Sequence, residues 1–249
     1  MAIRPSPSMR IKAYCHTHQG VLPYAPTMNY FVTGTDTGVG KTLISCALLH
    51  GFAAQGKRVI GMKPVAAGCD AGEQNDDVLQ LRAASNVAVS YGLINPYCFL
   101  LAIAPHIAAQ RAGVIIDFSV MAKSYQELAA QADVVIVEGI GGLRVPLSAQ
   151  QDGADLVQEL GLPVILVVGM RLGCLNHALL TVEAIAARSL TLAGWVANVV
   201  EADMPMCEEN IAALQQRIAA PLLGVVPYMT RADARVAARQ LDLELLEQD

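Results

Sequence analysis

The chain has 249 residues, of which 54% are hydrophobic and 16% charged, and its formal net charge is −5. This length suits one large α/β domain or two small ones, and the hydrophobic content is ample for a substantial core. The acidic balance argues against a general nucleic-acid-binding protein, which would carry a basic face. The longest apolar stretches, around residues 97–109 and 160–170, are interrupted or too short to span a bilayer. We therefore predict no nucleic-acid partner and no membrane span.

Six cysteines stand at positions 15, 46, 69, 98, 174 and 207, without a Cys-x-x-Cys pair. They fall largely within apolar segments. We interpret them as buried reduced thiols of a cytoplasmic protein, and not as a metal site or a disulfide framework.

Residues 1–27 differ from the rest of the chain. They contain Arg4, Arg10 and Lys12, but no acidic residue and no periodic apolar pattern. The segment resembles a transit peptide in being basic and acid-free, but it lacks the apolar core of a secretory signal. We expect a disordered N-terminal extension, which an upstream start would also explain, and a working domain over residues 28–249.

A glycine-rich turn at residues 29–42 follows the first apolar run of this domain. Tyr30 to Val32 indicate a buried parallel strand, and the pattern from Leu43 to Ala54 indicates a helix. A phosphate-binding loop needs this context, because glycine-rich backbone and a helix N-terminus present N–H donors to phosphate oxygens. Lys41 is placed to reach the outer phosphates and Thr42 to ligate Mg²⁺.

The spacing of this loop departs from the strict pattern, in which a glycine stands five residues before Gly40. Thr35 occupies that position, and the first glycine is Gly34. An ordinary glycine-rich strand–helix turn is the alternative. The run Gly-Lys-Thr at residues 40–42 favours nucleoside triphosphate binding instead.

Strand and helix patterns alternate along the rest of the chain. This alternation, without an internal repeat or a linker after residue 28, predicts a single doubly wound α/β domain with a mostly parallel sheet, of the P-loop NTPase type. The further strands are predicted at 58–63, 133–138, 163–169, 191–198 and 222–226, and the further helices at 76–84, 119–131, 154–160, 174–188 and 207–219.

Polar residues stand at the carboxyl ends of these strands, where ligands of open parallel sheets collect. Lys63 ends the second strand, Glu138 ends the third, and Asp77 follows the turn after the second. The two carboxylates and the hydroxyl of Thr42 are hard oxygen ligands that suit Mg²⁺. Lys41 and Lys63 can neutralise charge on a transferred phosphoryl group. A single strand-end lysine or glutamate is often only solvated, but convergence beside a phosphate loop favours a catalytic role.

The adjacent acids Asp76 and Asp77 are harder to separate, because aspartates also cap helices well. We expect Asp76 to be the N-cap of the following helix and Asp77 to face the metal.

Four runs carry a family resemblance: 33–42 (TGTDTGVGKT), 63–66 (KPVA), 75–77 (NDD) and 137–142 (VEGIGG). The runs at 163–169, 172–177 and 194–198 extend it. Together they resemble dethiobiotin synthetase over roughly residues 28–229. The phosphate loop alone is shared with many ATPases, whereas the ordered set is far more specific.

The resemblance implies an ATP- and Mg²⁺-dependent cyclo-ligase of biotin biosynthesis that forms a homodimer. Such enzymes join CO₂ to one amine of 7,8-diaminononanoate as a carbamate. ATP phosphorylates the carbamate, and the second amine closes the ureido ring of dethiobiotin with release of phosphate. A carbamate oxygen is a weak nucleophile, so its attack needs in-line positioning and charge neutralisation.

The resemblance also implies roles for individual residues. Lys63 and Lys41 match catalytic lysines, and Thr42, Asp77 and Glu138 match the Mg²⁺ ligands. A helix start at 173–176 matches the site that receives the substrate carboxylate across a homodimer interface, which suits an anion at a helix N-terminus. The other implied nucleotide contacts are Thr37, Gly38, Val39, Gly40, Leu43, Gly139, Ile140, Gly141, Asn198 as the adenine reader, Val199, Pro227, Tyr228 and Met229, and the implied substrate contacts are Ala67, Gly173 and Asn176.

Two positions depart from the family pattern. Gly38 replaces an acidic residue present in some members, which removes one carboxylate near the phosphates. Ala67 stands where a serine hydroxyl often meets the substrate, so one hydrogen bond worth about 0.5–1.5 kcal/mol is lost.

Two other classes share this kind of loop. Nucleotide-switched ATPases of the partitioning type usually carry a second lysine early in the loop, where this chain has Thr35-Asp36-Thr37, and many end in a basic helix, whereas residues 241–249 are acidic. Amidoligases of cobalamin synthesis need a glutaminase domain that is not found in this sequence. The synthetase remains the preferred interpretation.

Overall fold

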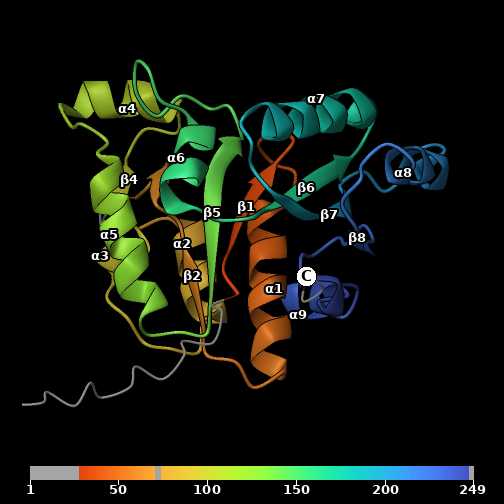
Figure 1. Cartoon of the computed structure of the whole chain (residues 1–249), viewed down its shortest axis with the longest axis horizontal. Coiled ribbons are helices and arrows are strands. Elements are labelled where there is room, and N and C mark those ends of the chain that lie inside the picture. Colours follow the sequence, from red (N-terminus) through yellow and green to blue (C-terminus); the bar gives the residue numbers. More distant parts are fainter. Residues whose placement is uncertain (1–27, 71–73, 247–249) are drawn as a thin grey trace, which may run out of the picture.

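A computed structural model describes residues 28–70 and 74–246. A parallel sheet of six strands forms its centre, in the order β2-β5-β1-β6-β7-β8 (Figure 1). The strands are β1 (Tyr30–Gly34), β2 (Val59–Met62), β5 (Val134–Gly142), β6 (Val164–Met170), β7 (Leu192–Val199) and β8 (Leu222–Val226). The predicted doubly wound α/β domain is confirmed.

Both faces of the central strands are buried, which is why they read as almost continuous apolar runs. Alternate residues of β1 enter two separate cores: Phe31 packs on one face, and Tyr30 and Val32 pack on the other. In β5, Val135 and Val137 share the core of Phe31. The two cores fix the register of the sheet, because a shift by one residue would exchange the faces.

Helices cover both faces of the sheet. One face packs against α1 (Lys41–Ala54), α2 (Asp76–Ala84) and α9 (Ala234–Ala238). The other packs against α5 (Phe118–Ala129), α6 (Gly153–Leu160), α7 (Cys174–Ala187) and α8 (Cys207–Gln215). Since every strand is parallel, all carboxyl ends meet at one edge of the sheet, where the loops that follow β1, β2 and β5 come together (Figure 1).

The predicted strands and helices are confirmed, with differences at their ends. α1 begins at Lys41, two residues earlier than predicted, because the helix starts directly after Gly40. β5 continues through Gly139 to Gly142, since this glycine run stays paired with β1 at Gly34. α8 ends at Gln215 and is shorter than the predicted segment.

A second, two-stranded parallel sheet was not predicted. It pairs β3 (Val65–Ala67) with β4 (Tyr97–Phe99). The other elements beyond the predictions are short: α3 (Tyr91–Ile94), α4 (Pro105–Ala112), α9 and the 3-10 turn η1 (Glu244–Leu246). β3 begins two residues after Lys63, so the second sheet lies next to the predicted site.

One prediction about the cysteines is wrong. Cys69 and Cys98 form a disulfide, with their Cα atoms 6.2 Å apart. Cys46 and Cys174 are buried free thiols, as predicted, Cys207 is a free thiol that is only partly buried, and Cys15 lies outside the described residues. The bonded pair is separated by 29 positions and is brought together only by the β3–β4 pairing, which the sequence pattern did not reveal.

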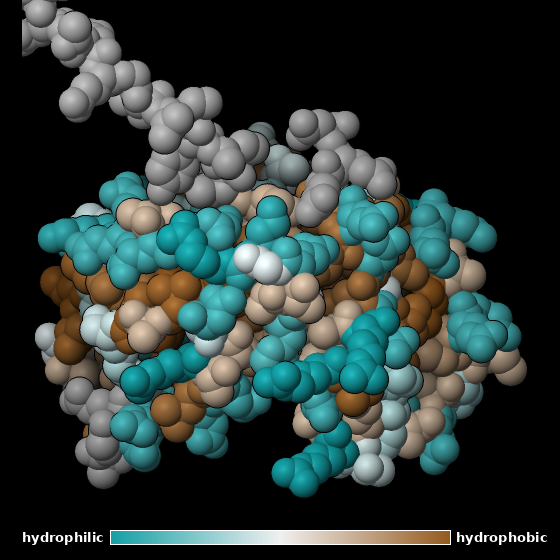
Figure 2. Space-filling view, turned by 90° about the horizontal axis from the view of Figure 1, so that it is seen from below, coloured by the Kyte–Doolittle hydropathy of each residue, from teal (hydrophilic) through white to brown (hydrophobic). Residues whose placement is uncertain are grey.

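Among the described residues, no helix is long and apolar enough to cross a membrane. Figure 2, which views the molecule from below, shows hydrophilic and hydrophobic residues interspersed over that side. The predicted extension at residues 1–27 lies outside the described residues.

Candidate active site

The loop after β1 has the backbone of an anion-binding loop. Gly38 and Gly40 adopt φ angles of 75° and 90°, which favour glycine. Gly40 caps α1 without any side-chain hydrogen bond, and the first turn of α1 contains no acidic residue. The N–H groups and the positive end of the helix therefore remain available to an anion.

Lys41 is the first residue of α1, and its side chain turns back into the loop. Its Nζ atom donates to the carbonyl oxygen of Asp36 at 2.9 Å. Only 7% of this lysine is exposed. Burial, assisted by the positive charge of Lys63, lowers the pKa of Lys41 to about 8, although Glu138 and Asp77 oppose the shift.

Lys63, Asp77 and Glu138 meet at one point. The Nζ atom of Lys63 lies 2.6 Å from Oε1 of Glu138 and 2.8 Å from Oδ2 of Asp77. The hydroxyl of Thr42 donates to the same Oε1 atom at 2.9 Å. The side chains of Lys63 and Glu138 are 5% and 1% exposed, whereas that of Asp77 is 41% exposed. The first turns of α1 and α2, the residue that follows β2 and a residue within β5 thus place four predicted site residues in direct contact.

The charges in this cluster support one another. Burial alone would lower the pKa of Lys63, but the carboxylates of Glu138 and Asp77 outweigh it and raise the pKa above its ordinary value. Burial would likewise raise the pKa of Asp77, but Lys63 outweighs it and lowers the pKa. Lys63 is therefore an ammonium and Asp77 a carboxylate at neutral pH.

The start of α2 corrects one prediction. Asn75, and not Asp76, is the N-cap: its side-chain oxygen accepts from the backbone N–H of Asp77 at 3.1 Å. Asp77 contacts Lys63, while Asp76 is exposed, and the expected contact of Asp77 with a metal stays a prediction. The side chain of Asn75 thus caps α2 and, by the same hydrogen bond, positions the site residue Asp77.

The donor set fits Mg²⁺. Glu138 Oε2 is buried and has no hydrogen-bond partner among the described residues, and it belongs to the carboxylate whose other oxygen contacts Thr42. The hydroxyl and the two carboxylates of Thr42, Asp77 and Glu138 are the oxygen donors that Mg²⁺ prefers. An unpartnered buried oxygen has a cost that a cation would remove.

Asn198 lies behind the phosphate loop. It is 4% exposed, and its side-chain nitrogen donates to the carbonyl oxygen of Val39 at 2.9 Å. A Cβ atom on Gly40 would overlap the Asn198 amide, so the glycine is needed for this approach. Val199 ends β7 beside Asn198, and residues 227–229 follow β8, the strand paired with β7. Tyr228 is 44% exposed.

A cleft of about 810 Å³ lies over the loop and the charged cluster. It brings together most of the predicted residues, and an apolar wall that was not predicted faces them from the segment between β4 and α4 and from residues 145–146. The predicted residues in the lining are Thr37, Gly38, Gly40, Lys41, Thr42, Lys63, Ala67, Asp77, Glu138, Ile140 and Gly141, and the new ones are Ala102, Ile103, Ala104, Pro105, Val145 and Pro146.

Some predicted residues do not line this cleft. Val39 and Asn198 are buried behind the loop, and Leu43 packs against the core that contains α1. Gly139 is held against Phe31, whose Cε1 atom would lie 2.9 Å from an added Cβ. Gly173 and Asn176 are exposed at the start of α7, outside the lining.

Asp36 and Arg171 form a further contact at the loop that sequence reasoning missed. Their side chains are 2.5 Å apart, and the Asp36 carbonyl receives Lys41. Asp36 stands inside the conspicuous run Thr35-Asp36-Thr37, which was a usable signal. Arg171 follows β6 directly, but no local pattern distinguishes it from a solvated arginine.

The arrangement of strands and helices resembles that of a solved structure. The MinC:MinD cell division protein complex of Aquifex aeolicus matches with a TM-score of 0.52 at 14% identity, over 84% of this chain and 85% of the other. At this identity the likeness shows the fold alone. The fold is that of the P-loop NTPases, as predicted.

The sequence comparisons are more specific. The model of a family described as AAA domain matches residues 28–235. The ATP-dependent dethiobiotin synthetase BioD of Nitrosospira multiformis is 58% identical over 214 residues, which cover 86% of this chain and 94% of the relative. The synthetase of the same name from Aromatoleum aromaticum is 59% identical over 213 residues, with coverages of 84% and 95%. With such identity over nearly the whole length of these relatives, the chain belongs to the ATP-dependent dethiobiotin synthetase family.

Proposed function

We propose that the chain converts 7,8-diaminononanoate, CO₂ and ATP to dethiobiotin, ADP and phosphate in biotin biosynthesis. The observation that carries the proposal is the buried ammonium of Lys63, which follows β2 and is held between Glu138 and Asp77 beside the phosphate-binding loop. A fixed positive charge at this place suits a reaction in which an anionic carbamate must approach an anionic triphosphate. The family membership supplies the substrates.

The reaction has three steps in which each bond is accounted for. One amine of the substrate adds to CO₂ and loses a proton, which gives a carbamate. The carbamate oxygen attacks the γ-phosphorus of ATP, and the bond to ADP breaks. The second amine then attacks the carbonyl carbon, loses a proton and expels phosphate, which closes the ring.

The residues of the cleft have separate parts in these steps. The N–H groups of residues 38–42 hold the phosphates, and Lys41 neutralises their charge. Lys63 binds the carbamate and the γ-phosphate and aligns them, which is the main requirement in phosphoryl transfer. Thr42, Asp77 and Glu138 would hold Mg²⁺, which when bound neutralises charge on the phosphates. Asn198 and residues 227–229 would contact the adenine.

The apolar wall of the cleft suits the alkyl chain of the diamine. Ile103 and Pro105 line the same cleft as Ala67 and Lys63. Gly173 and Asn176 do not line the cleft of their own chain, so we assign them to the cleft of a second copy, where they would receive the substrate carboxylate. Leu172, next to them, is 96% exposed, which suits an interface in a homodimer. We place the enzyme in the cytoplasm, with small molecules and neither nucleic acid nor membrane as partners.

The test is a coupled assay with the purified chain, the diamine, bicarbonate and MgATP. Dethiobiotin and phosphate should form together, and omission of either the diamine or Mg²⁺ should abolish both. Lys63→Ala should abolish turnover and keep much of the ATP binding. If ATP hydrolysis ignores the diamine, the chain behaves as a nucleotide-switched ATPase instead and the synthetase proposal fails.

A further inference from the structure

We propose that the Cys69–Cys98 disulfide is a reversible thiol–disulfide switch that sets the activity of the adjacent site. The proposal rests on the roles given above to Lys63 and Asp77. In a reducing compartment, disulfides of mesophilic proteins are usually transient and regulatory or catalytic. A disulfide beside the site of an enzyme placed in the cytoplasm therefore calls for such an explanation.

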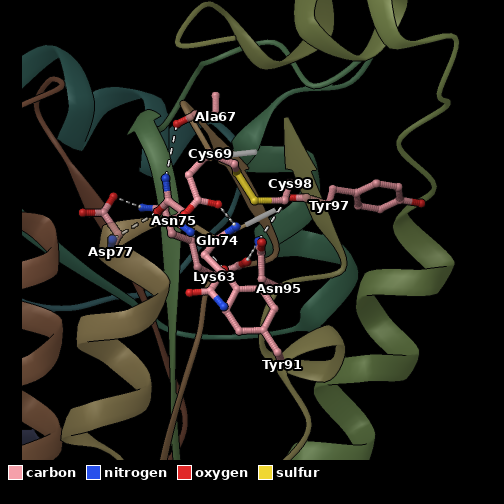
Figure 3. Close-up of a disulfide and its surroundings, with 11 residues drawn as sticks. Lys63, Ala67, Cys69, Gln74, Asn75, Asp77, Tyr91, Asn95, Tyr97 and Cys98 are labelled. Atoms are coloured by element: carbon pink, nitrogen blue, oxygen red, sulfur yellow. Dashed lines mark hydrogen bonds and ion pairs between the residues drawn. A yellow bond between two sulfur atoms is a disulfide. The ribbon is translucent and has the colours of Figure 1, made fainter. Parts of the chain in front are cut away.

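The disulfide lies at one end of the hydrogen-bond ladder between β3 and β4, and Lys63 lies at the other end. Lys63 itself takes part, since its N–H donates to Ile94 and its carbonyl accepts from the side chain of Asn95 at 2.6 Å. Further along, the N–H of Tyr97 donates to Pro64 at 3.1 Å, and the N–H of Cys69 donates to the carbonyl of Phe99 at 3.0 Å. Figure 3 shows the disulfide, Asn95 and Lys63 in this arrangement.

A second path leads from the same segment to Asp77. Asn75 donates from its side chain to the carbonyl of Ala67, the last residue of β3, at 3.4 Å. The same side chain caps α2 by accepting from the N–H of Asp77 (Figure 3). The N–H of Asn75 donates to the hydroxyl of Tyr91, which precedes β4 in the chain. Movement of β3 would therefore displace the cap that positions Asp77.

The sheet that the disulfide closes is small. β3 and β4 have three residues each, and among the residues that the structure describes they pair only with each other. A two-stranded sheet of this length is marginal alone, and such elements open locally at low free energy. The covalent bond holds the pairing closed. Reduction would let the ladder fray from the Cys69 end, toward Ala67 and the cap on α2.

The two cysteine residues differ in exposure. Cys69 is 8% exposed and packs with Val78 and Ile94, whereas Cys98 is partly exposed. Cys98 lines a separate cleft of about 960 Å³, together with Tyr97 and Leu101. An incoming thiolate would thus reach Cys98 first.

The exchange is balanced with a low-molecular-weight thiol as the reductant. Its thiolate attacks Cys98 Sγ, the bond to Cys69 breaks, and Cys69 leaves as a thiolate that takes up a proton. A second thiolate then attacks the mixed disulfide and releases the reductant as its own disulfide. Two protein thiols and one small disulfide result, and the reverse reaction with a small disulfide restores the switch.

The test equilibrates the full-length chain in mixtures of reduced and oxidised glutathione. Alkylation and peptide mass analysis report the state of Cys69 and Cys98, and the coupled assay reports kcat/KM. We expect kcat/KM of the oxidised form to exceed that of the reduced form by about fivefold or more, which is the range of common coupling effects. Trapped mixed disulfide should lie on Cys98. Equal kcat/KM values in the two forms, no disulfide at any glutathione ratio, or mixed disulfide mainly on Cys69 would overturn the proposal.

Cysteine variants distinguish the effect of the Cys69–Cys98 disulfide on activity from other effects of added thiols. The double variant Cys69→Ser/Cys98→Ser should show the activity of the reduced form in every buffer. The control Cys207→Ser, on α8, should respond to glutathione like the unaltered chain. If the double variant keeps the activity of the oxidised form, the switch is excluded.

Amide hydrogen exchange of the unaltered chain tests the structural step without reference to turnover. Reduction should speed exchange in residues 63–69 and at Asp77, and leave α8 unchanged. This readout distinguishes the two proposals, because a chain without synthetase activity would still show the change. Unaltered exchange on reduction would refute the switch even if the synthetase activity is present.

Discussion

The Nζ atom of Lys63 lies 2.6 Å from Oε1 of Glu138, and both side chains are almost completely removed from solvent. Neither charge is favourable there without the other, because an isolated ion in a protein interior loses its hydration without compensation. Asp77 and Thr42 complete the contacts at the more open side. The Lys63–Glu138 pair should therefore affect the free energy of unfolding in addition to its proposed role in catalysis.

Removal of one member of this pair should destabilise the fold more than removal of both. Lys63→Met leaves the Glu138 carboxylate buried and unpaired, with an expected cost of about 3–5 kcal/mol in the free energy of unfolding. The double variant Lys63→Met/Glu138→Gln should recover most of this loss. Urea unfolding without Mg²⁺ and nucleotide measures both. A double variant no more stable than the single one would show that the pair is not the source of the cost.

The buried charge of Lys41 should lower the free energy of unfolding at neutral pH. Its pKa is about 8 in the folded chain and 10.5 ordinarily, and one pKa unit corresponds to about 1.4 kcal/mol. After allowance for the lost hydrogen bond to Asp36, Lys41→Met should raise the free energy of unfolding at neutral pH by about 2 kcal/mol. Urea unfolding measures this gain, and ATP binding should weaken strongly in the same variant.

The sign of the pH dependence follows from the lowered pKa. Below about pH 8 the lysine is charged in both the folded and the unfolded chain, so the cost of burying the charge is fully present. As the pH rises from about 8 to 10.5, the folded chain releases the proton first and the unaltered chain gains stability. The advantage of Lys41→Met should shrink over this interval. A constant difference would contradict the assigned pKa.

Asn75→Ala should lower both stability and turnover, because Asn75 caps α2 and orients Asp77. Loss of an N-cap costs about 0.5–2 kcal/mol. Asp117 offers a matched control, since it caps α5 by accepting from the N–H of Ser119 at 2.8 Å, away from the cleft. Asp117→Ala should cost similar stability in thermal unfolding, yet leave kcat unchanged. Equal effects of the two variants on kcat would show that Asn75 acts through stability alone.

The sequence pattern predicted the elements that are buried on both sides. β1, β2 and β5 are apolar at nearly every position. Lys63 after β2 and Glu138 in β5 converge because the carboxyl ends of parallel strands lie at one edge of the sheet. β3 and β4 escaped prediction because three residues carry too little periodicity. The disulfide was not predicted either, because only the β3–β4 pairing brings its two cysteines together.

The N-cap of α2 could not be assigned from the sequence for a different reason. Asn75, Asp76 and Asp77 can each cap a helix, and only the packing of the preceding turn selects Asn75. Tertiary contacts likewise decide the partners of Arg171 and the apolar wall at Ile103, since local pattern contains no information about which distant segment an exposed residue meets.

Gly40 should be the least replaceable residue of the phosphate loop. An alanine there would meet both a left-handed backbone, with φ of 90°, and the buried amide of Asn198. Gly56 has a similar φ of 82° but nothing within 4 Å of an added Cβ, so it isolates the backbone effect. Gly56→Ala should cost about 1–2 kcal/mol of stability and leave ATP affinity unchanged. Gly40→Ala should in addition weaken ATP binding by more than about tenfold in calorimetric titration, equivalent to about 1.4 kcal/mol. Equal ATP affinities in the two variants would mean that the contact between Gly40 and Asn198 does not shape the loop.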